Sequence, residues 1–231
     1  MFEPRFDHPR FIADIGGTFA RFAIEVAPQV FEHSASLRCE AFADFHAAVT
    51  AYLSNLNGVG HSDIKHAALA IANPVAGDQV RMTNYHWQFS IEQMRQRLNF
   101  DSLVVVNDFT ALAMAVPSLT GQQRRQVGAG TAVPRSVVGL IGAGTGLGVS
   151  GLIPADDGWI ALGTEGGHSS FSPHDAREIA ILQYAWRHFR HVSFERLLSG
   201  AGIELMFRAL TERAGLPTFA EAPVDAPVET E

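Results

Sequence analysis

Two glycine-rich segments of the chain carry the residue types that bind phosphate. The first, called here the first turn, is Asp14-Ile15-Gly16-Gly17-Thr18, and Arg21 follows it. Backbone N–H groups in a concave glycine turn donate to phosphate oxygens, and glycine lets the phosphate approach closely. The Thr18 hydroxyl and the Arg21 guanidinium add a donor and a positive charge. We expect Asp14 to hold Mg²⁺ through water, because this ion keeps most of its hydration shell.

The second turn is Gly142-Ala143-Gly144-Thr145-Gly146-Leu147-Gly148. A dinucleotide fingerprint overlaps it as Gly146-x-Gly148-x-x-Gly151. That fingerprint requires a helix after the turn, whereas Leu147, Val149 and Leu152 with their glycines indicate a strand, so we reject a dinucleotide fold. Taken alone, the first turn is better explained as a plain β-hairpin turn. Two such turns in one chain are far more specific for phosphate.

A carboxylate follows a strongly apolar strand. The strand Leu103–Val106 delivers Asn107 and Asp108 to the start of a helix, and ligands bind at strand ends in α/β sheets. A helix N-terminus favours negative charge by about 0.3–1 kcal/mol, so we expect Asp108 to be ionised there. An ionised aspartate can take the proton of an alcohol that attacks phosphorus. The alternative is that Asp108 serves only as the N-cap of the helix.

Two further polar segments suit hydroxyl groups. Glu165-Gly166-Gly167-His168 places a carboxylate and an imidazole on glycines, which we expect to be flexible, and both side chains can hydrogen-bond a sugar. Glu195 is a further candidate sugar ligand. The alternatives are a plain surface turn for the first segment and a surface ion pair for Glu195.

The elements that must position these residues follow from the chain pattern. In the first half we expect three strands, a helix, a strand, a helix, a strand and a last helix that ends before Pro117. The strands are predicted at Phe11–Asp14, Phe22–Val26, Cys39–Phe42, Ala67–Ala72 and Leu103–Val106, and the first two helices at Ala43–Leu56 and from Ser90, which begins the capping-box pattern Ser90-x-x-Gln93. Gly16 and Gly17 favour a tight hairpin, because both can adopt positive φ.

The second half repeats the strand–turn–strand plan after a loop at Thr120–Pro134, which we take as a domain boundary. We expect a small lobe at residues 1–117 and a large lobe at residues 118–231. Strands are predicted at Ser136–Gly142 and Gly148–Ile153, helices from Ser172-Pro173 to Arg190 and at Gly202–Ala214, and a linker at Pro217–Glu231.

Composition limits the class of protein. Seventeen lysines and arginines against 24 acids give a net charge of −7, which argues against nucleic-acid or anionic-membrane partners. Three features favour a location in the cytoplasm. The chain has one cysteine, Met1–Arg10 shows no signal-peptide pattern, and no long apolar run is present in the sequence. The P-loop and protein-kinase motifs both need a lysine at a fixed place. The one lysine, Lys65, follows no glycine-rich loop, which excludes both folds.

Taken together and in this order, the motifs resemble those of bacterial glucokinases over nearly all of residues 11–213. The matching motifs are Asp14-x-Gly-Gly-Thr-x-x-Arg21, Pro74-Val75-x-Gly77 through Met82-Thr83-Asn84-x-x-Trp87, Val106-Asn107-Asp108-Phe109, Gly142–Gly148, Glu165-Gly-Gly-His168 and Glu195-Arg-x-Leu-Ser-Gly200.

The resemblance implies a two-lobed hexokinase/actin-like α/β fold of the ribonuclease H-like type. It implies ATP- and Mg²⁺-dependent phosphorylation of the 6-hydroxyl of glucose, the first step of glycolysis, with Asp108 as general base. It implies a glucose site made of Asn107, Glu165, His168 and Glu195, phosphate loops at Asp14–Thr18 and Gly144-Thr145-Gly146, and a homodimer.

The chain departs from the resemblance in length. Members of that family continue beyond position 231 with an adenosine-binding segment and a final helix, so we expect the second lobe to be incomplete, a C-terminal truncation, and the activity of this chain alone to be in doubt. Two rivals are a non-catalytic sugar sensor and an acetate-kinase-like enzyme. The Glu165 and His168 pair favours a polyol over an acyl substrate.

Overall fold

The computed structural model describes residues 6–56, 63–82 and 85–215. They divide into two compact units. The first takes the residues up to Arg135 together with Ile153–Ala161, and the second takes Ser136–Leu152 and the residues from Leu162 on. The boundary between residues 117 and 118 stays a prediction. No helix in these ranges is long and apolar enough to span a bilayer.

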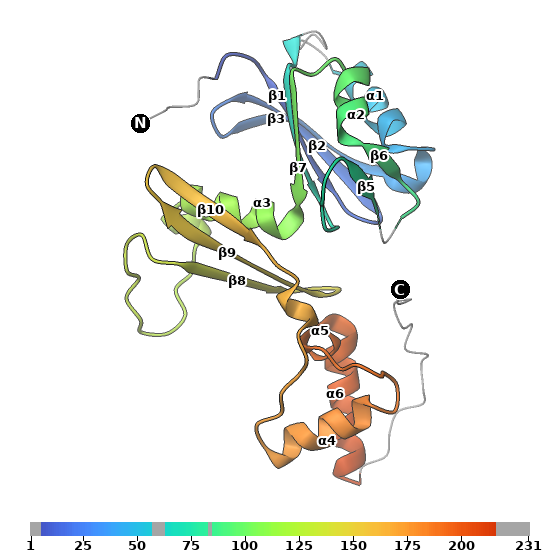
Figure 1. Cartoon of the computed structure of the whole chain (residues 1–231), viewed down its shortest axis with the longest axis vertical. Coiled ribbons are helices and arrows are strands. Elements are labelled where there is room, and N and C mark those ends of the chain that lie inside the picture. Colours follow the sequence, from blue (N-terminus) through green and yellow to red (C-terminus); the bar gives the residue numbers. More distant parts are fainter. Residues whose placement is uncertain (1–5, 57–62, 83–84, 216–231) are drawn as a thin grey trace. The chain divides into compact units, whose positions relative to one another are not determined.

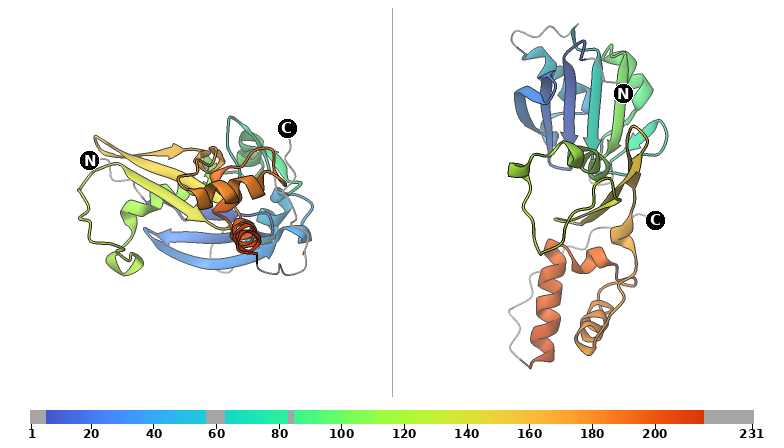
Figure 2. Two further views of the ribbon diagram at one scale, coloured as in Figure 1. Left: turned by 90° about the horizontal axis from the view of Figure 1, so that it is seen from below. Right: turned by 90° about the vertical axis from the view of Figure 1, so that its left-hand side faces the viewer.

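A five-stranded mixed sheet with the order β3-β2-β1-β4-β7 forms the first unit (Figure 1). Its strands are β1 (Arg10–Ile15), β2 (Phe19–Ala27), β3 (Val30–Arg38), β4 (His66–Ile71) and β7 (Ser102–Asn107). Strand β2 runs antiparallel to both β1 and β3, whereas β1, β4 and β7 are parallel to one another. The right-hand view of Figure 2 shows these strands side by side. The first unit also contains a two-stranded ribbon of β5 (Gln79–Arg81) and β6 (Gln88–Ser90).

The register of the parallel strands sets where the polar residues lie. Ile15 of β1 pairs with Ile71 of β4, which in turn pairs with Asn107 of β7. The carboxyl ends of the three strands therefore reach one level. Asp14 and Asp108 come to the same edge of the sheet although they lie far apart in the sequence.

One face of this sheet carries the core of the first unit. Phe11, Ala13 and Ile15 alternate along β1 and are at most 2% exposed. Burial of a large apolar side chain stabilises the fold by about 1.5–3 kcal/mol. The helices α1 (Phe45–Ser54) and α2 (Ile91–Arg97) cover this face (Figure 1). The predicted helix start at Ser90 is confirmed, because its hydroxyl accepts the Gln93 N–H at 3.1 Å.

Two details of the first unit differ from the predictions. The third strand is β3, and Cys39–Ala41 forms a 3-10 turn, so the predicted strand Cys39–Phe42 is wrong. The edge strand β3 is largely exposed, so its sequence lacks the apolar alternation that reveals a strand. The hairpin at the first turn is confirmed, but neither Gly16 nor Gly17 has positive φ. The loop is longer than a tight turn and is closed by the Gly16 N–H donating to the Phe19 carbonyl at 2.9 Å.

A three-stranded sheet with the order β10-β9-β8 follows in the chain. Its strands are β8 (Val138–Ala143), β9 (Leu147–Ala155) and β10 (Gly158–Gly163). The two predicted strands are confirmed with small shifts of their ends, whereas β10 was not predicted. The Asp157-Gly158 pair before it is a strong hairpin signal that could have revealed it.

Three helices build the rest of the second unit, namely α4 (Ala176–Ala185), α5 (Phe194–Leu197) and α6 (Gly200–Arg213). The predicted start of α4 at Ser172-Pro173 and its predicted end at Arg190 are wrong. The side chain of Asp175 caps the helix by accepting the N–H groups of Arg177 and Glu178, both at 2.8 Å. Gly215, with φ of +65°, follows α6 as predicted. The predicted linker Pro217–Glu231 lies outside the described residues.

Candidate functional site

Asn107 connects β7 to helix α3 (Asp108–Ala115). It is the last residue of the strand and the N-cap of the helix, because its Oδ1 accepts the N–H groups of Phe109 at 3.0 Å and Thr110 at 3.2 Å. The cap of this helix is therefore Asn107, and the alternative that Asp108 serves only as N-cap is wrong.

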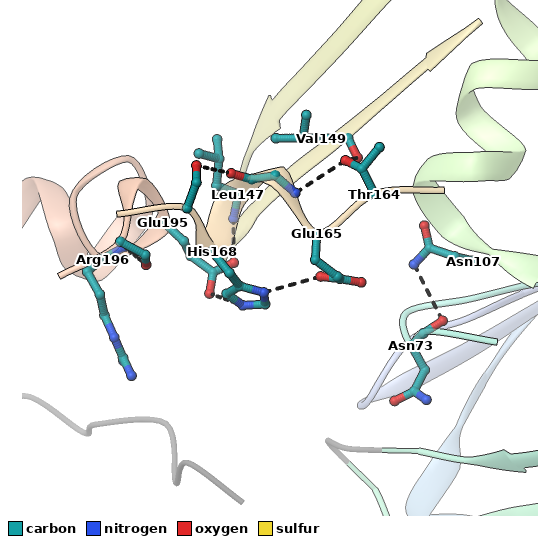
Figure 3. Close-up of polar contacts among 12 residues, drawn as sticks. Asn73, Asn107, Leu147, Val149, Thr164, Glu165, His168, Glu195 and Arg196 are labelled. Atoms are coloured by element: carbon teal, nitrogen blue, oxygen red, sulfur yellow. Dashed lines mark hydrogen bonds and ion pairs between the residues drawn. The ribbon is translucent and has the colours of Figure 1, made fainter. Parts of the chain in front are cut away.

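The two oxygens of the Asp108 carboxylate differ in their partners. Oδ1 accepts the Phe109 N–H at 2.8 Å and the Asn107 Nδ2–H at 3.0 Å. Among the described residues, Oδ2 has no recorded hydrogen bond. The Asn107 amide also donates to the carbonyl of Asn73 at 3.4 Å, which fixes its orientation (Figure 3). One oxygen of Asp108 is thus held and the other is available for a ligand.

The pKa of Asp108 is raised above its ordinary value. The main cause is burial, which disfavours the charged form, and the charge of Asp14 adds to it. The hydrogen bonds from Phe109 and Asn107 oppose the rise without cancelling it. Burial and a neighbouring acid therefore outweigh the helix N-terminus, and the carboxylate becomes a better proton acceptor.

The first turn presents unused backbone donors. The Gly16 N–H is taken by the Phe19 carbonyl, whereas the N–H groups of Gly17 and Thr18 have no acceptor among the described residues. Cys39 supports the turn from the core, with its N–H donating to the Thr18 carbonyl at 2.9 Å. Two adjacent free amides of this kind match the oxygens of one phosphate group.

Asp14 stands beside this turn and is paired. Its Oδ2 accepts from Arg21 Nη1 at 2.8 Å, with both side chains more than half exposed. No group of three or more potential metal ligands exists in the described part of the chain. A Mg²⁺ ion that keeps its water and binds mainly to nucleotide phosphates needs one or two protein carboxylates, so the donor set of Asp14 and the Thr18 hydroxyl fits it.

The second turn has the same design. The Gly144 N–H donates to the Gly146 carbonyl at 2.8 Å, and the N–H groups of Thr145 and Gly146 have no acceptor within the described ranges. The turn leads into strand β9, which agrees with the rejection of a dinucleotide fold. Both turns therefore expose two neighbouring amides.

Three of the predicted sugar ligands meet in the second unit (Figure 3). His168 Nδ1 lies 3.3 Å from Glu165 Oε2, and His168 Nε2 lies 3.2 Å from Glu195 Oε1. The other oxygen of Glu195 accepts the Leu147 N–H at 2.8 Å. Neither the plain surface turn nor the ordinary surface ion pair describes this arrangement, because the histidine lies between two carboxylates.

The glycines before His168 serve close packing. A Cβ on Gly167 would lie 2.1 Å from the Leu147 carbonyl oxygen, and one on Gly166 would lie 2.9 Å from Val149 Cγ1. Neither glycine has positive φ. The expectation that they make the loop flexible is therefore wrong, since they let the short helix η5 (Gly166–His168) lie directly against β9.

Comparison with known proteins decides the family. A family model described as Glucokinase matches residues 11–228. The chain belongs to the glucokinase family. It is 58% identical over 207 residues to the bifunctional protein glk of Burkholderia orbicola, and 52% identical over 204 residues to the glucokinase of Neisseria gonorrhoeae.

A solved glucokinase from an Antarctic psychrotroph shows the family fold. It superposes on 94% of this chain and 68% of its own chain with a TM-score of 0.81 at 33% identity. The predicted two-lobed sugar-kinase fold is confirmed. The match to the Burkholderia protein covers 90% of this chain but 32% of that protein. The match to the Neisseria glucokinase covers 88% of this chain but 61% of that protein, so this chain spans less than two thirds of either relative.

Several residues of the site were not predicted from the sequence. Asn73 lies two residues beyond the end of β4 and accepts the Asn107 amide through its backbone carbonyl, which no side-chain pattern predicts. Leu147 and Gly200 act through their backbones, which no side-chain pattern reveals.

Proposed function

We propose that this glucokinase-family chain carries the sugar-binding and phosphate-binding residues of an enzyme that transfers the γ-phosphate of ATP to the 6-hydroxyl of glucose. The observation that carries the proposal is the Asp108 carboxylate at the strand ends that also bear the first turn, with one oxygen held and the other without a partner among the described residues. Family membership supports the choice of reaction.

The chemical step uses Asp108 as general base. Its Oδ2 takes the proton of the 6-hydroxyl while that oxygen forms a bond to the γ-phosphorus. The bond from the γ-phosphorus to the β–γ bridging oxygen breaks, and ADP leaves with that electron pair. General-base assistance of this kind contributes about 10²–10⁴ in rate, and positioning with charge stabilisation supplies the rest.

Glucose would be held by hydroxyl hydrogen bonds. The carboxylates of Glu165 and Glu195 accept from sugar hydroxyls, and His168 can donate to one. Each ring nitrogen of His168 lies beside one carboxylate, and a carboxylate oxygen can accept more than one hydrogen bond. Sugar hydroxyls can therefore complete the hydrogen bonds of this group. Asn107 is a further glucose ligand that the family resemblance implies.

The two turns would bind the phosphates of ATP. Each offers two adjacent backbone amides, Gly17 and Thr18 in the first and Thr145 and Gly146 in the second. Mg²⁺, when bound near Asp14, offsets negative charge on the phosphates. Arg21, which pairs with Asp14, also supplies positive charge at this place.

Two further expectations belong to this proposal. We infer a cytoplasmic protein that acts as a homodimer, with glucose and ATP as its small-molecule partners and no nucleic-acid or membrane partner. Sedimentation equilibrium over a range of concentrations tests the dimer, because a constant monomer mass would contradict it.

The experiment that tests the function uses labelled ATP. With [γ-³²P]ATP and Mg²⁺, we expect label to enter glucose and not 6-deoxyglucose, which lacks the accepting hydroxyl. The assay is run on this chain and on a longer protein that contains it. Label in 6-deoxyglucose, or turnover of acetate with none of glucose, would contradict the proposal, and glucose binding without any transfer would favour the sugar-sensor alternative.

A further inference from the structure

The Glu195 carboxylate contacts two different parts of the second unit with its two oxygens. Oε1 lies 3.2 Å from His168 Nε2, among the proposed sugar ligands. Oε2 accepts the N–H of Leu147 at 2.8 Å, at the end of the second turn. One carboxylate thus connects the proposed sugar site directly to the backbone of a proposed phosphate-binding turn.

The second turn depends on few other contacts. The N–H of Gly200, the first residue of α6, donates to the Gly144 carbonyl at 2.9 Å. Gly144 and Gly146 bond to each other within the turn. The Leu147 N–H to Glu195 bond is therefore the side-chain contact that holds the far end of the turn, and a bond to a charged acceptor is stronger than one between neutral groups.

A glycine next to this contact leaves room for the carboxylate in its observed position. A Cβ on Gly146 would lie 2.4 Å from Glu195 Oε2, and no other atom of the described residues comes within 3 Å of it. The backbone of Gly146 does not have positive φ. The same Oε2 atom thus lies against the turn at both Gly146 and Leu147, and an added methyl group at Gly146 would displace it.

We infer that Glu195 is a positioning residue that couples the sugar site to the second turn. A sugar hydroxyl that bonds to Oε1 restrains the carboxylate, and the restrained Oε2 holds Leu147 and the free amides of Thr145 and Gly146 in the geometry that accepts phosphate. This inference rests on the proposed function. It predicts that glucose and a nucleotide bind with positive coupling, and by linkage each raises the affinity for the other equally.

The first test measures amide hydrogen exchange at Leu147 by NMR, without ligands. We expect Glu195→Ala and Gly146→Ala to speed this exchange by about tenfold or more, since both remove a bond to a charged acceptor. Glu165→Ala is the matched control, because Glu165 shares the His168 contact but, within the described part of the chain, has no hydrogen bond or ion pair to the turn. Unchanged exchange of the Leu205 amide in α6 shows that the variants remain folded.

Two outcomes of the first test overturn the inference. Exchange at Leu147 that is the same in Glu195→Ala and wild type would show that the carboxylate does not hold the turn. Equal acceleration by Glu165→Ala would show that the effect spreads through His168 and is not specific to Glu195.

The second test adds ligands. By calorimetry with glucose and a non-hydrolysable ATP analogue, we expect wild type and Glu165→Gln to retain a coupling of about fivefold or more, and Glu195→Gln to lose it. Glu165→Gln is expected to weaken glucose binding while keeping the coupling. Equal coupling in all three proteins would overturn the inference and leave the proposed function intact. No glucose binding by wild type would overturn the proposed function and the coupling with it, while the exchange test still decides whether Glu195 holds Leu147.

Discussion

At the scale of single residues, the surroundings of Asp108 favour catalysis at the expense of stability. Burial and the charge of Asp14 both raise its pKa. The folded state therefore binds a proton at Asp108 more readily than the unfolded chain does. The stability of the fold is higher below the ordinary pKa of 3.8 and decreases as the pH rises through the raised value.

Removing this charge should stabilise the protein. We expect Asp108→Asn to raise the unfolding midpoint near neutral pH by about 1–3 °C, the shift that up to ~1 kcal/mol produces in a chain of this size. Asparagine keeps an oxygen that can accept the Phe109 N–H, so the helix start is preserved. Scanning calorimetry from pH 3 to 7 should show a difference that grows with pH. A variant less stable than wild type at neutral pH would contradict the desolvation argument.

At the scale of elements, close packing of η5 on β9 positions the sugar ligands. A methyl group on Gly167 would meet the Leu147 carbonyl, whereas one on Gly158 would meet no atom of the described chain within 4 Å. We expect Gly167→Ala to weaken glucose binding by about tenfold or more, because misplacing a binding group by about 1 Å is costly. Gly158→Ala is the matched control and should bind glucose as wild type does in the same calorimetric titration.

The cap of α2 offers a stability test remote from the site. Ser90 is buried and accepts the Gln93 N–H. Ser90→Ala should lower the free energy of unfolding by about 1 kcal/mol, the usual cost of losing an N-cap. Ser54→Ala, at the exposed last position of α1, should change it by less than about 0.5 kcal/mol. Urea denaturation measures both, and equal effects would show that the cap contributes nothing.

The sequence predicted the strands that have a clear run of apolar residues and missed a strand that lacks one. The apolar runs at β4 and β7 predicted both strands correctly, although β7 is an edge strand and its Val104 is 54% exposed, because valine and other β-formers favour strands in either position. β3 was missed because an exposed edge strand needs no apolar alternation. Glu165, His168 and Glu195 were chosen by type and resemblance, but their common contact at His168 depends on backbone packing that no local pattern encodes.

At the scale of the whole molecule, the two units have cores of different size. Among the described residues, 23 buried residues form the core cluster of the first unit and seven form that of the second. In the second, Ile203 and Phe207 of α6 remain 65% and 57% exposed. Stability rises with buried apolar area, so the second unit should be the less stable of the two.

Hydrogen exchange can measure this difference. We expect backbone amides in the middle of α6 to exchange at least about tenfold faster than those of β4 in the unliganded chain, because smaller cores open at lower free energy. Leu205 and Leu69 are suitable reporters, since both are buried within their elements. Equal protection of the two would indicate that the units unfold as one cooperative body.

The proposed reaction depends most directly on Asp108 as the proton acceptor. The decisive measurement is the turnover of glucose and ATP by a protein that contains this chain, compared with its Asp108→Asn and Asp101→Asn variants. Asp101 precedes β7 at its opposite end and is an exposed aspartate. We predict that Asp108→Asn lowers kcat by about 10²–10⁴ with little change in glucose affinity, while Asp101→Asn keeps full activity. Retention of kcat in Asp108→Asn would contradict the role of Asp108 as general base.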